Sequence, residues 1–321
     1  MARLTELSFA DAQRLLTHFR IELGELVPLD AGSVNSNFLL LTPSGQEYFA
    51  RLYEEQGPSG ADFEGRVNQA LAQAGLPVAR PVSTHDGRLH VLHGSKPFSV
   101  YERVHGEVLC QKRVTPEVAE SLGRGLAGVH LAKLGDLVVP ESRFGFSQLE
   151  ERLDRVQGSG RTDLLPAASQ VRALARRIQA ARRSDLPTGL IHGDLFRDNA
   201  LVDLSVSPTR ISALLDFESA CRGPYVYDLM VTLLAWCYGD ELDTRLARSL
   251  LQGYESVRPL SALERANLVS EGSVACVRFA STRLTDFSLR VPAGTPPARD
   301  YGRFLARLDA LEAGVLARAL R

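Results

Sequence analysis

Residues 190–216 constrain the fold of this chain most strongly, because short apolar runs alternate there with specific polar loops. The segment begins LIHGDLFRDNALV, which places a histidine, two aspartates and an asparagine between two apolar runs, and it ends near ISALLDF. The run ALV leads away from Asn199, DLSVSPT forms a turn and ISALL returns, which predicts an antiparallel hairpin. Asn199 and Asp216 are therefore expected at the same end of that hairpin.

The polar residues around this hairpin suit phosphate transfer. Asn199 and Asp216 offer two oxygen ligands, and Mg²⁺ prefers few protein oxygens, with phosphate and water completing its shell. Asp194 is the candidate general base for a substrate hydroxyl, a role that contributes about 10²–10⁴-fold to a rate. An acidic turn is the alternative interpretation of an isolated HGD, but D-x-x-x-x-N followed by D-F matches the parts of a kinase site. His192 is expected to brace the loop.

The N-terminal part of the chain has the pattern of a small sheet with helices. Ser8 and Asp11 predict a capped helix at the start, and residues 62–78 predict a second helix that ends near Gly75. The turn TPSGQ joins the first two predicted strands. The predicted strands are short: 37–41, 47–53, 88–92 and 98–101.

The rest of the chain is predominantly helical in pattern. Thr115 and Pro116 start one helix, residues 166–185 form an amphipathic one, and Ser261 opens a capping box. Residues 299–321 are predicted to form one long final helix. We therefore predict an α+β fold of two lobes, a small N-terminal β-sheet lobe and a large, mainly α C-terminal lobe. The predicted boundaries are 1–104 for the nucleotide-binding lobe and 105–321 for the catalytic and substrate lobe.

Composition narrows the classes of partner. The 321 residues contain 37 basic and 38 acidic side chains, and this balance argues against a nucleic-acid partner. The longest apolar run, 225–238, is too short to span a bilayer and contains Asp228, so no membrane partner is expected. Four scattered cysteines and the lack of a signal-peptide pattern at the start predict a cytoplasmic protein.

A nucleotide site is predicted in the N-terminal lobe. The segment AGSVNSNFLLL, residues 31–41, is the candidate phosphate loop, whose backbone N–H groups can cradle phosphate oxygens. Arg51 is expected to reach the nucleotide phosphates and Glu64 to pair with it, although a surface arginine and a surface glutamate are an equal alternative. The backbone from Glu102 to Val104 is the candidate for the adenine edge. The chain has no G-x-x-x-x-G-K-[ST] motif, which excludes a P-loop fold.

Four segments carry a resemblance to a known family: LIHGDLFRDNALV, LLDFESACRGPYVYDLMVTLLAWCY, LLQGYESVRPLSALER and VRFASTRLTD. Together they resemble the aminoglycoside-phosphotransferase and choline-kinase-like family, and within it the branch of kinase-type homoserine kinases. The resemblance implies the bilobal protein-kinase-like fold and ATP- and Mg²⁺-dependent phosphorylation of the L-homoserine hydroxyl, a step of threonine biosynthesis. It covers about residues 188–290 well and 25–110 loosely.

The resemblance also implies roles for individual residues. Asp194 is the implied catalytic base, and Asp228 braces the catalytic loop from the long helix. The implied Mg²⁺ ligands and phosphate-loop residues are Asn199, Asp216, Ser33, Asn35 and Asn37. Two positions depart from the family pattern: Arg51 stands where a lysine is frequent, and Glu218 stands where an aromatic residue is expected beside the metal site.

Homoserine is a zwitterion, so its pocket is expected to offer one cation and one anion. Structural ion pairing is an equal alternative for Arg283 and Asp286, which lie three residues apart on one helical face. The candidates are Arg197, Arg222 and Arg283 for the carboxylate, and Glu218, Asp228 and Asp286 for the ammonium group.

Two further functions stay open at this point. The first is the same chemistry on another small alcohol, such as an aminoglycoside, choline or another amino alcohol. The second is a nucleotide-binding regulator without turnover. The balanced charge does not favour a polycationic acceptor, and the joint presence of Asp194, Asn199 and Asp216 does not favour a regulator.

Overall fold

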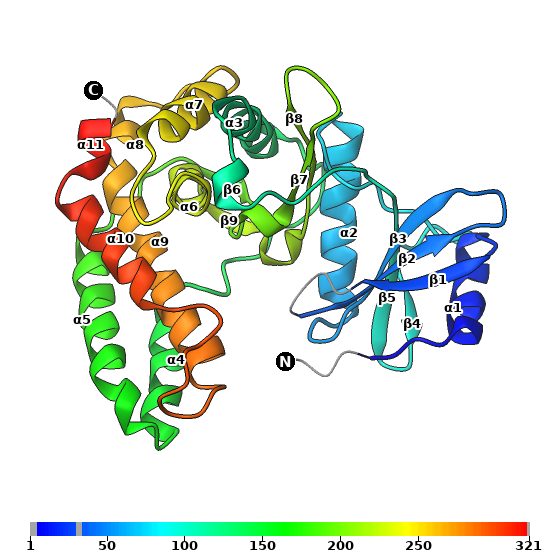
Figure 1. Ribbon diagram of the computed structural model, residues 1–321, viewed down its shortest axis with the longest axis horizontal. Coiled ribbons are helices and arrows are strands. Elements are labelled where there is room, and N and C mark those ends of the chain that lie inside the picture. Colours follow the sequence, from blue (N-terminus) through cyan, green and yellow to red (C-terminus); the bar gives the residue numbers. More distant parts are fainter. Residues whose placement is uncertain (1–4, 30–33, 320–321) are drawn as a thin grey trace. The chain divides into compact units, whose positions relative to one another are not determined.

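The computed structural model describes residues 5–29 and 34–319, and it divides into two compact units. The first unit contains an antiparallel sheet and the second is mainly helical, which confirms the predicted α+β class (Figure 1). The first unit comprises residues 1–108, 132–138 and 198–218, and the second comprises 109–131, 139–197 and 219–321. The functional boundary between residues 104 and 105 stays a prediction, because this division follows packing and assigns segment 198–218 to the first unit.

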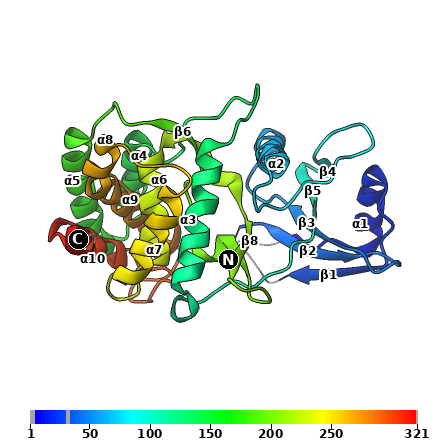
Figure 2. The same cartoon turned by 90° about the horizontal axis from the view of Figure 1, so that it is seen from above.

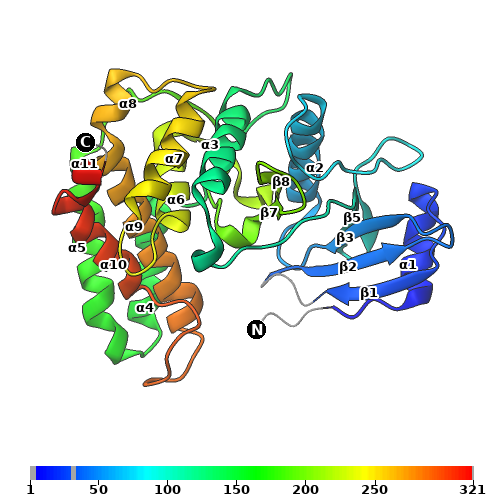
Figure 3. The same cartoon turned by 45° about the horizontal axis from the view of Figure 1, so that its top comes forward.

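The five-stranded sheet of the first unit is antiparallel throughout and has the order β1-β2-β3-β5-β4. Figure 3 shows β1, β2 and β3 side by side. Its strands are β1 (Glu25–Leu29), β2 (Ser36–Leu41), β3 (Glu47–Leu52), β4 (Val91–His93) and β5 (Lys96–Glu102). Strands β2, β3 and β5 match the predicted ones, whereas β4 is shifted toward the C-terminus of its prediction. Strand β1 was not predicted, because Pro28 interrupts its strand pattern. Asn37 pairs with Arg51 in the register of β2 and β3.

Among the described residues of this unit, two α-helices accompany the sheet, α1 (Phe9–Leu16) and α2 (Pro58–Gln73). The Ser8 hydroxyl accepts the Asp11 backbone N–H, so the predicted N-terminal cap is confirmed. Helix α1 buries Ala12 and Leu16 in a core that also contains Leu40 and Phe98 of the sheet. Burial of one such leucine side chain contributes about 1.5–3 kcal/mol, so this core fixes α1 against the sheet.

The predicted hairpin is present in the first unit. Strand β7 (Ala200–Asp203) pairs antiparallel with β8 (Arg210–Leu214), with Ala200 opposite Leu214. The Leu215 backbone N–H donates to the Asn199 carbonyl at 2.9 Å, so the chain leaves the hairpin where it entered. This register confirms that Asn199 and Asp216 flank the same end of the hairpin.

The second unit combines a two-stranded sheet with nine helices in its described residues. The strands are β6 (Thr188–Ile191) and β9 (Cys221–Pro224), which pair antiparallel. The helices are α3 (Pro116–Leu131), α4 (Phe146–Gly158), α5 (Leu165–Ala181), α6 (Tyr225–Trp236), α7 (Thr244–Glu255), α8 (Ala262–Ala266), α9 (Leu268–Arg283), α10 (Gly302–Glu312) and α11 (Val315–Ala319). A π-helical turn, Leu284–Ser288, follows α9 directly.

Helix α9 is the central helix of this unit, since it packs against α5, α6 and α10 (Figure 2). Helices α3 and α7 pack at very close range: a Cβ at Gly123 would lie 2.1 Å from the Leu250 carbonyl oxygen. The prediction of one final helix is wrong, because Gly314, with φ +77°, separates α10 from α11. Among the described residues, no helix combines the length and apolarity needed to cross a membrane.

Candidate active site

The loop that carries Asp194 follows β6, and hydrogen bonds to its backbone N–H groups fix its conformation. The Asp228 carboxylate, from the first turn of α6, accepts the backbone N–H groups of His192 at 2.7 Å and Gly193 at 2.8 Å. Gly193 has φ +76°, and a Cβ there would lie 2.9 Å from the Ser219 carbonyl oxygen, so only glycine suits this turn. The loop is therefore fixed before a substrate arrives.

A buried network fixes Asp228 in turn. His130 Nε2 lies 3.0 Å from Asp228 Oδ2, and His130 Nδ1 lies 2.7 Å from the Tyr254 hydroxyl. Burial raises the pKa of Asp228, but the hydrogen bond and charge of His130 outweigh it, so the pKa stays below its ordinary value. Asp228 has no exposed surface, and this geometry favours the bracing role over the ammonium-binding one.

Asp194 itself forms an ion pair within the second unit. Arg278, from the middle of α9, donates from Nη1 to Asp194 Oδ1 at 3.0 Å. The Asp194 side chain is 32% exposed, whereas that of Arg278 is 4% exposed. Arg278 is not among the residues predicted from the sequence. The sequence signal that could have identified it is an arginine between apolar residues in the segment ACVRFA, which lies in the largely buried helix α9.

The first unit contains a second charged cluster, centred on Arg51 of β3. Arg51 Nη1 lies 3.2 Å from both Glu64 Oε1 of α2 and Asp216 Oδ1, and Arg51 Nε donates to Asn37 Oδ1 at 3.3 Å. The predicted Arg51–Glu64 pair is thus present and is buried, not on the surface. Burial raises the pKa of Glu64 to about 7, although the charge of Arg51 opposes this shift.

Two tyrosines extend this cluster, and neither was predicted from its sequence context. The Tyr53 hydroxyl donates to Glu64 Oε2 at 2.8 Å and lies 3.0 Å from the Tyr101 hydroxyl. Tyr53 follows β3 and Tyr101 lies on β5, so both belong to the strands next to Arg51. Both of the Glu64 carboxylate oxygens therefore have a donor.

The residues at the open end of the hairpin suit a Mg²⁺ ion that is shared with a nucleotide. Asp216 has φ +64°, a left-handed conformation that is rare outside glycine and frequent at functional sites. Asn199 flanks the same end of the hairpin, so one carboxylate and one amide come from neighbouring positions. A carboxylate and an amide oxygen are ligands that Mg²⁺ accepts when phosphate and water complete its shell. Across the described residues, no group of three His, Cys, Asp or Glu side chains could hold a metal ion.

The candidate phosphate-loop residues fall partly within the described structure. Ser33 lies outside the described residues. Asn35 is buried; its Nδ2 donates to Glu218 Oε2 at 3.2 Å and its Oδ1 accepts the Glu54 backbone N–H at 3.2 Å. The Glu218 carbonyl accepts Gln56 Nε2 at 3.2 Å. Glu218 is therefore hydrogen-bonded to residues that precede β2 and follow β3 in the first unit.

The candidate adenine-binding backbone lies at the end of β5. The Glu102 backbone N–H donates to the Arg80 carbonyl at 2.8 Å, and the two side chains form an exposed ion pair. Val104 lies two residues beyond the strand. The role of Glu102 and Val104 stays a prediction.

The three arginines predicted for the acceptor carboxylate have other partners in the second unit. Arg197 donates from Nη1 to Gln111 Oε1, and Arg222 is exposed, with its Nη2 3.3 Å from Thr188 Oγ1. Arg283 donates to the Asp300 carbonyl at 2.9 Å, and its burial beside other arginines lowers its pKa to about 10. None of these three contacts involves Asp194.

Asp286 forms a helix-to-helix ion pair and does not pair with Arg283. Arg152 of α4 donates from Nη1 to both Asp286 oxygens, at 2.8 and 2.9 Å. This geometry favours the structural alternative for Asp286 over ammonium binding.

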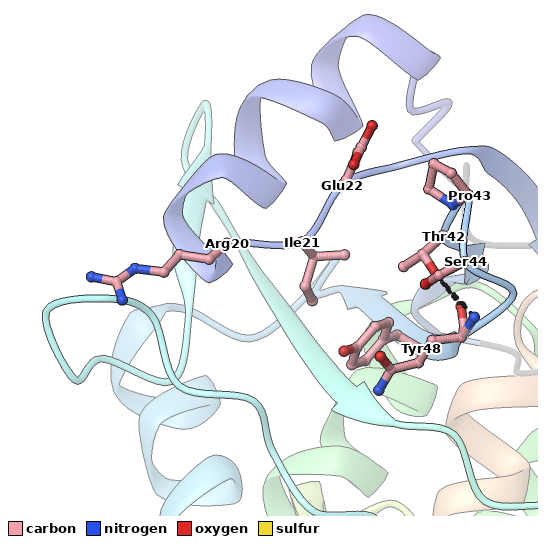
Figure 4. A pocket seen from close by; sticks show the side chains of 8 residues that line it. Arg20, Ile21, Glu22, Thr42, Pro43, Ser44 and Tyr48 are labelled. Carbon is pink, nitrogen blue, oxygen red and sulfur yellow. Dashed lines mark hydrogen bonds between the residues drawn. The ribbon is translucent and has the colours of Figure 1, made fainter.

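A surface pocket of about 480 Å³ lies elsewhere in the first unit. It is lined by residues 20–22 and by the turn between β2 and β3, at the opposite end of β2 from Asn37. Ile21 and Tyr48 lie side by side in it, whereas Arg20 and Glu22 point away (Figure 4). The charged residues that line this pocket, Arg20 and Glu22, are exposed, so it has no buried ion pair of the kind found at Arg51 or Asp194.

The fold, the braced acidic loop and the Arg51–Glu64 pair define the class of kinase-like small-molecule phosphotransferases. A family model described as "Phosphotransferase enzyme family" matches residues 25–260. The chain therefore belongs to this family, as its sequence motifs predict.

Curated relatives match most of the chain. One from Neisseria meningitidis serogroup B, named homoserine kinase, is 34% identical over 276 residues, which is 83% of this chain and 86% of the relative. Another, from Mesorhizobium japonicum and with the same name, is 31% identical over 96% of this chain and 95% of the relative.

Solved structures share the fold at low sequence identity. An amicoumacin kinase, solved with AMP-PNP, Ca²⁺ and Ami, matches with a TM-score of 0.67 and 18% identity over 95% of this chain and 92% of its own. A Plasmodium vivax ethanolamine kinase matches with a TM-score of 0.66 and 14% identity over 92% and 83%. These matches confirm the predicted protein-kinase-like fold.

Proposed function

We propose that this protein transfers the γ-phosphoryl group of ATP to the side-chain hydroxyl of L-homoserine, forming O-phospho-L-homoserine for threonine biosynthesis. One observation carries the proposal: relatives with 34% and 31% identity, matched over most of both chains, bear the name homoserine kinase. The proposed acceptor is a small molecule, and we assign no nucleic-acid or membrane partner. The proposed location is the cytoplasm.

Asp194 is the proposed catalytic base. A carboxylate that is 32% exposed can reach a substrate hydroxyl, and the hydrogen bonds from His192 and Gly193 to Asp228 hold its loop in one conformation. Such positioning matters because general-base catalysis requires the acceptor proton within hydrogen-bond reach. Asp228 is accordingly a positioning residue.

The Arg51 cluster is the proposed nucleotide side of the site. Arg51 is the proposed phosphate ligand, and its ion pair with Glu64 orients its guanidinium. The proposed phosphate loop contains Ser33, Asn35 and Asn37, of which Asn37 contacts Arg51. The backbone of residues 102–104 is proposed to contact the adenine, within a nucleotide-binding lobe of residues 1–104.

Asn199 and Asp216 are the proposed Mg²⁺ ligands. Their common position at the end of the hairpin and the left-handed backbone of Asp216 support this assignment. A bound Mg²⁺ ion supplies positive charge that neutralises the phosphate oxygens. The remaining residues, 105–321, are proposed to supply the base and the acceptor pocket.

The test is ADP release from Mg²⁺-ATP with a panel of alcohols: L-homoserine, L-serine, L-threonine, choline and an aminoglycoside. Turnover that is specific to L-homoserine and lost in Asp194→Asn is the expected result. Turnover of choline or an aminoglycoside alone would retain the chemistry and reject the acceptor. ATP binding without turnover of any alcohol would instead indicate a nucleotide-binding regulator.

A further inference from the structure

Arg278 is the most deeply buried cation beside the proposed base. It lies on α9, is 3% exposed, and its guanidinium carbon lies 3.8 Å from the ring centroid of Phe279 and 4.1 Å from that of Phe144. Contact with two aromatic rings favours a guanidinium and restricts its plane. The head group is therefore held in a defined orientation next to Asp194.

The hydrogen-bonding capacity of this guanidinium is largely unused. A guanidinium carries five N–H donors. Within the described residues, Arg278 donates from Nη1 to a single oxygen of Asp194, and its buried Nε has no hydrogen-bond partner. Buried charges are normally paired and hydrogen-bonded, because burial without partners is costly. An anion beside Asp194 would accept from the terminal N–H groups of Arg278 that Asp194 leaves unused.

Another arginine of the same unit, Arg182, provides a comparison, because its guanidinium makes two hydrogen bonds to one carboxylate. Arg182 contacts Glu271 with two donors, Nε at 2.8 Å and Nη2 at 2.6 Å. Glu271 is fully buried, so this pair is a two-donor structural fork. Arg278, which is more buried than Arg182, has a one-donor contact with a partly exposed acid.

We propose that Arg278 binds the carboxylate of the acceptor and so selects an amino acid as substrate. This inference rests on the proposed function, which makes the acceptor a hydroxy amino acid. Homoserine carries its carboxylate and its hydroxyl at opposite ends of a short carbon chain. An acceptor held by Arg278 at one end therefore presents its hydroxyl to the neighbouring Asp194, and Arg278 sets specificity while Asp194 takes the proton.

A purely structural role for Arg278 makes a different prediction. If Arg278 only orients Asp194, its removal slows every acceptor alike. If it also binds the carboxylate, its removal costs more on acceptors that have a carboxylate than on those that lack one. The comparison needs acceptor pairs that differ by this group alone: L-homoserine with propanolamine, and L-serine with ethanolamine.

The experiment measures kcat/KM for both pairs with wild type, Arg278→Met and Arg278→Lys. We expect wild type to prefer the carboxylate member, and Arg278→Met to lose about 10–100-fold more on that member than on its partner, mainly through KM. Arg278→Lys keeps the charge and should retain part of the preference. Arg307→Met is the matched control, because Arg307 is also buried and stacks on Tyr238 and Phe304 but does not contact Asp194.

Each outcome decides the inference. A preference that survives in Arg278→Met, or an equal loss on both members of a pair, overturns the role of Arg278 and leaves the homoserine proposal intact. Preference for L-serine, lost in Arg278→Met, keeps the carboxylate site and rejects homoserine. If wild type prefers propanolamine and ethanolamine, or turns over no acceptor, both proposals fail. Thermal unfolding of each variant separates misfolding from lost recognition.

Discussion

Arg51 and Asp216, which are 165 residues apart in the chain, form an ion pair with Nη1 and Oδ1 separated by 3.2 Å. The same Nη1 lies 3.2 Å from Glu64 Oε1, so one cation is shared by two carboxylates. The pair connects strand β3 to the end of the β7–β8 hairpin within the first unit. The proposed phosphate ligand and a proposed metal ligand are therefore organised together.

Replacement of Arg51 tests this arrangement through stability. Arg51→Met leaves Glu64 buried without its cation, and loss of one partner of a buried pair costs about 3–5 kcal/mol. The free energy of unfolding, measured in denaturant, should fall accordingly. The double variant Arg51→Met/Glu64→Gln should recover part of the loss, because it removes the buried Glu64 charge and leaves only the more exposed Asp216 without its cation. Equal stability of the single and double variants would show that the pair is not coupled.

The two tyrosines behind Glu64 should contribute unequally. Tyr53→Phe removes the donor to Glu64 Oε2 and also the partner of Tyr101, so it should cost about 1–3 kcal/mol. Tyr101→Phe removes only the outer hydroxyl and should cost less. Thermal unfolding of both variants gives the order, and a larger effect from Tyr101→Phe would contradict the direction of this hydrogen-bond chain.

The bracing role of Asp228 predicts a loss of activity that exceeds any loss of nucleotide binding. Asp228→Asn has one acceptor oxygen for the two N–H groups of His192 and Gly193, so the Asp194 loop should lose its fixed conformation. We expect kcat to fall at least about tenfold while the affinity for ATP stays near wild type. Thr232→Val is the control, because the Thr232 hydroxyl donates to the Asp228 backbone carbonyl and not to its carboxylate. Unchanged kcat in Asp228→Asn would reject the brace.

Glu54 gives a prediction about pH. Burial raises its pKa, but hydrogen bonds from Lys96, Ser36 and Thr5 outweigh burial and lower the pKa to about 2, from an ordinary value of 4.5. The folded state thus favours the ionised form, and the resulting stability is present above pH 4.5 and is lost as the pH falls toward 2. Glu54→Gln should destabilise the protein by about 1–2 kcal/mol at pH 7 and flatten its loss of stability in acid. Parallel pH curves of wild type and variant would contradict this account.

The parts of the site that could be predicted are those marked by patterns within short stretches of the sequence. The hairpin follows from two apolar runs around a turn, and it brings Asn199 and Asp216 to one end. The Arg51–Glu64 pair follows from a strand arginine and the helix after it. In both cases, short-range pattern and standard element geometry are sufficient.

The missed parts depend on long-range packing. His130 and Arg278 contact side chains 98 and 84 residues away, and Tyr53 contacts Tyr101, 48 residues away, so these contacts carry no local pattern. The same limit explains the acceptor candidates: Asp286 pairs with Arg152 of α4 and not with its helical neighbour Arg283. Charge spacing along one helix did not reveal a partner on another helix.

The most direct test of the proposed function is phosphorus NMR of the reaction of Mg²⁺-ATP with L-homoserine, with wild type and Asp194→Asn compared at equal saturation with ATP. The account predicts that wild type forms O-phospho-L-homoserine and that Asp194→Asn forms it about 10²–10⁴-fold more slowly. Wild-type turnover by Asp194→Asn would contradict the assignment of the base. If wild type phosphorylates another alcohol but forms no O-phospho-L-homoserine, the assignment of the acceptor is contradicted.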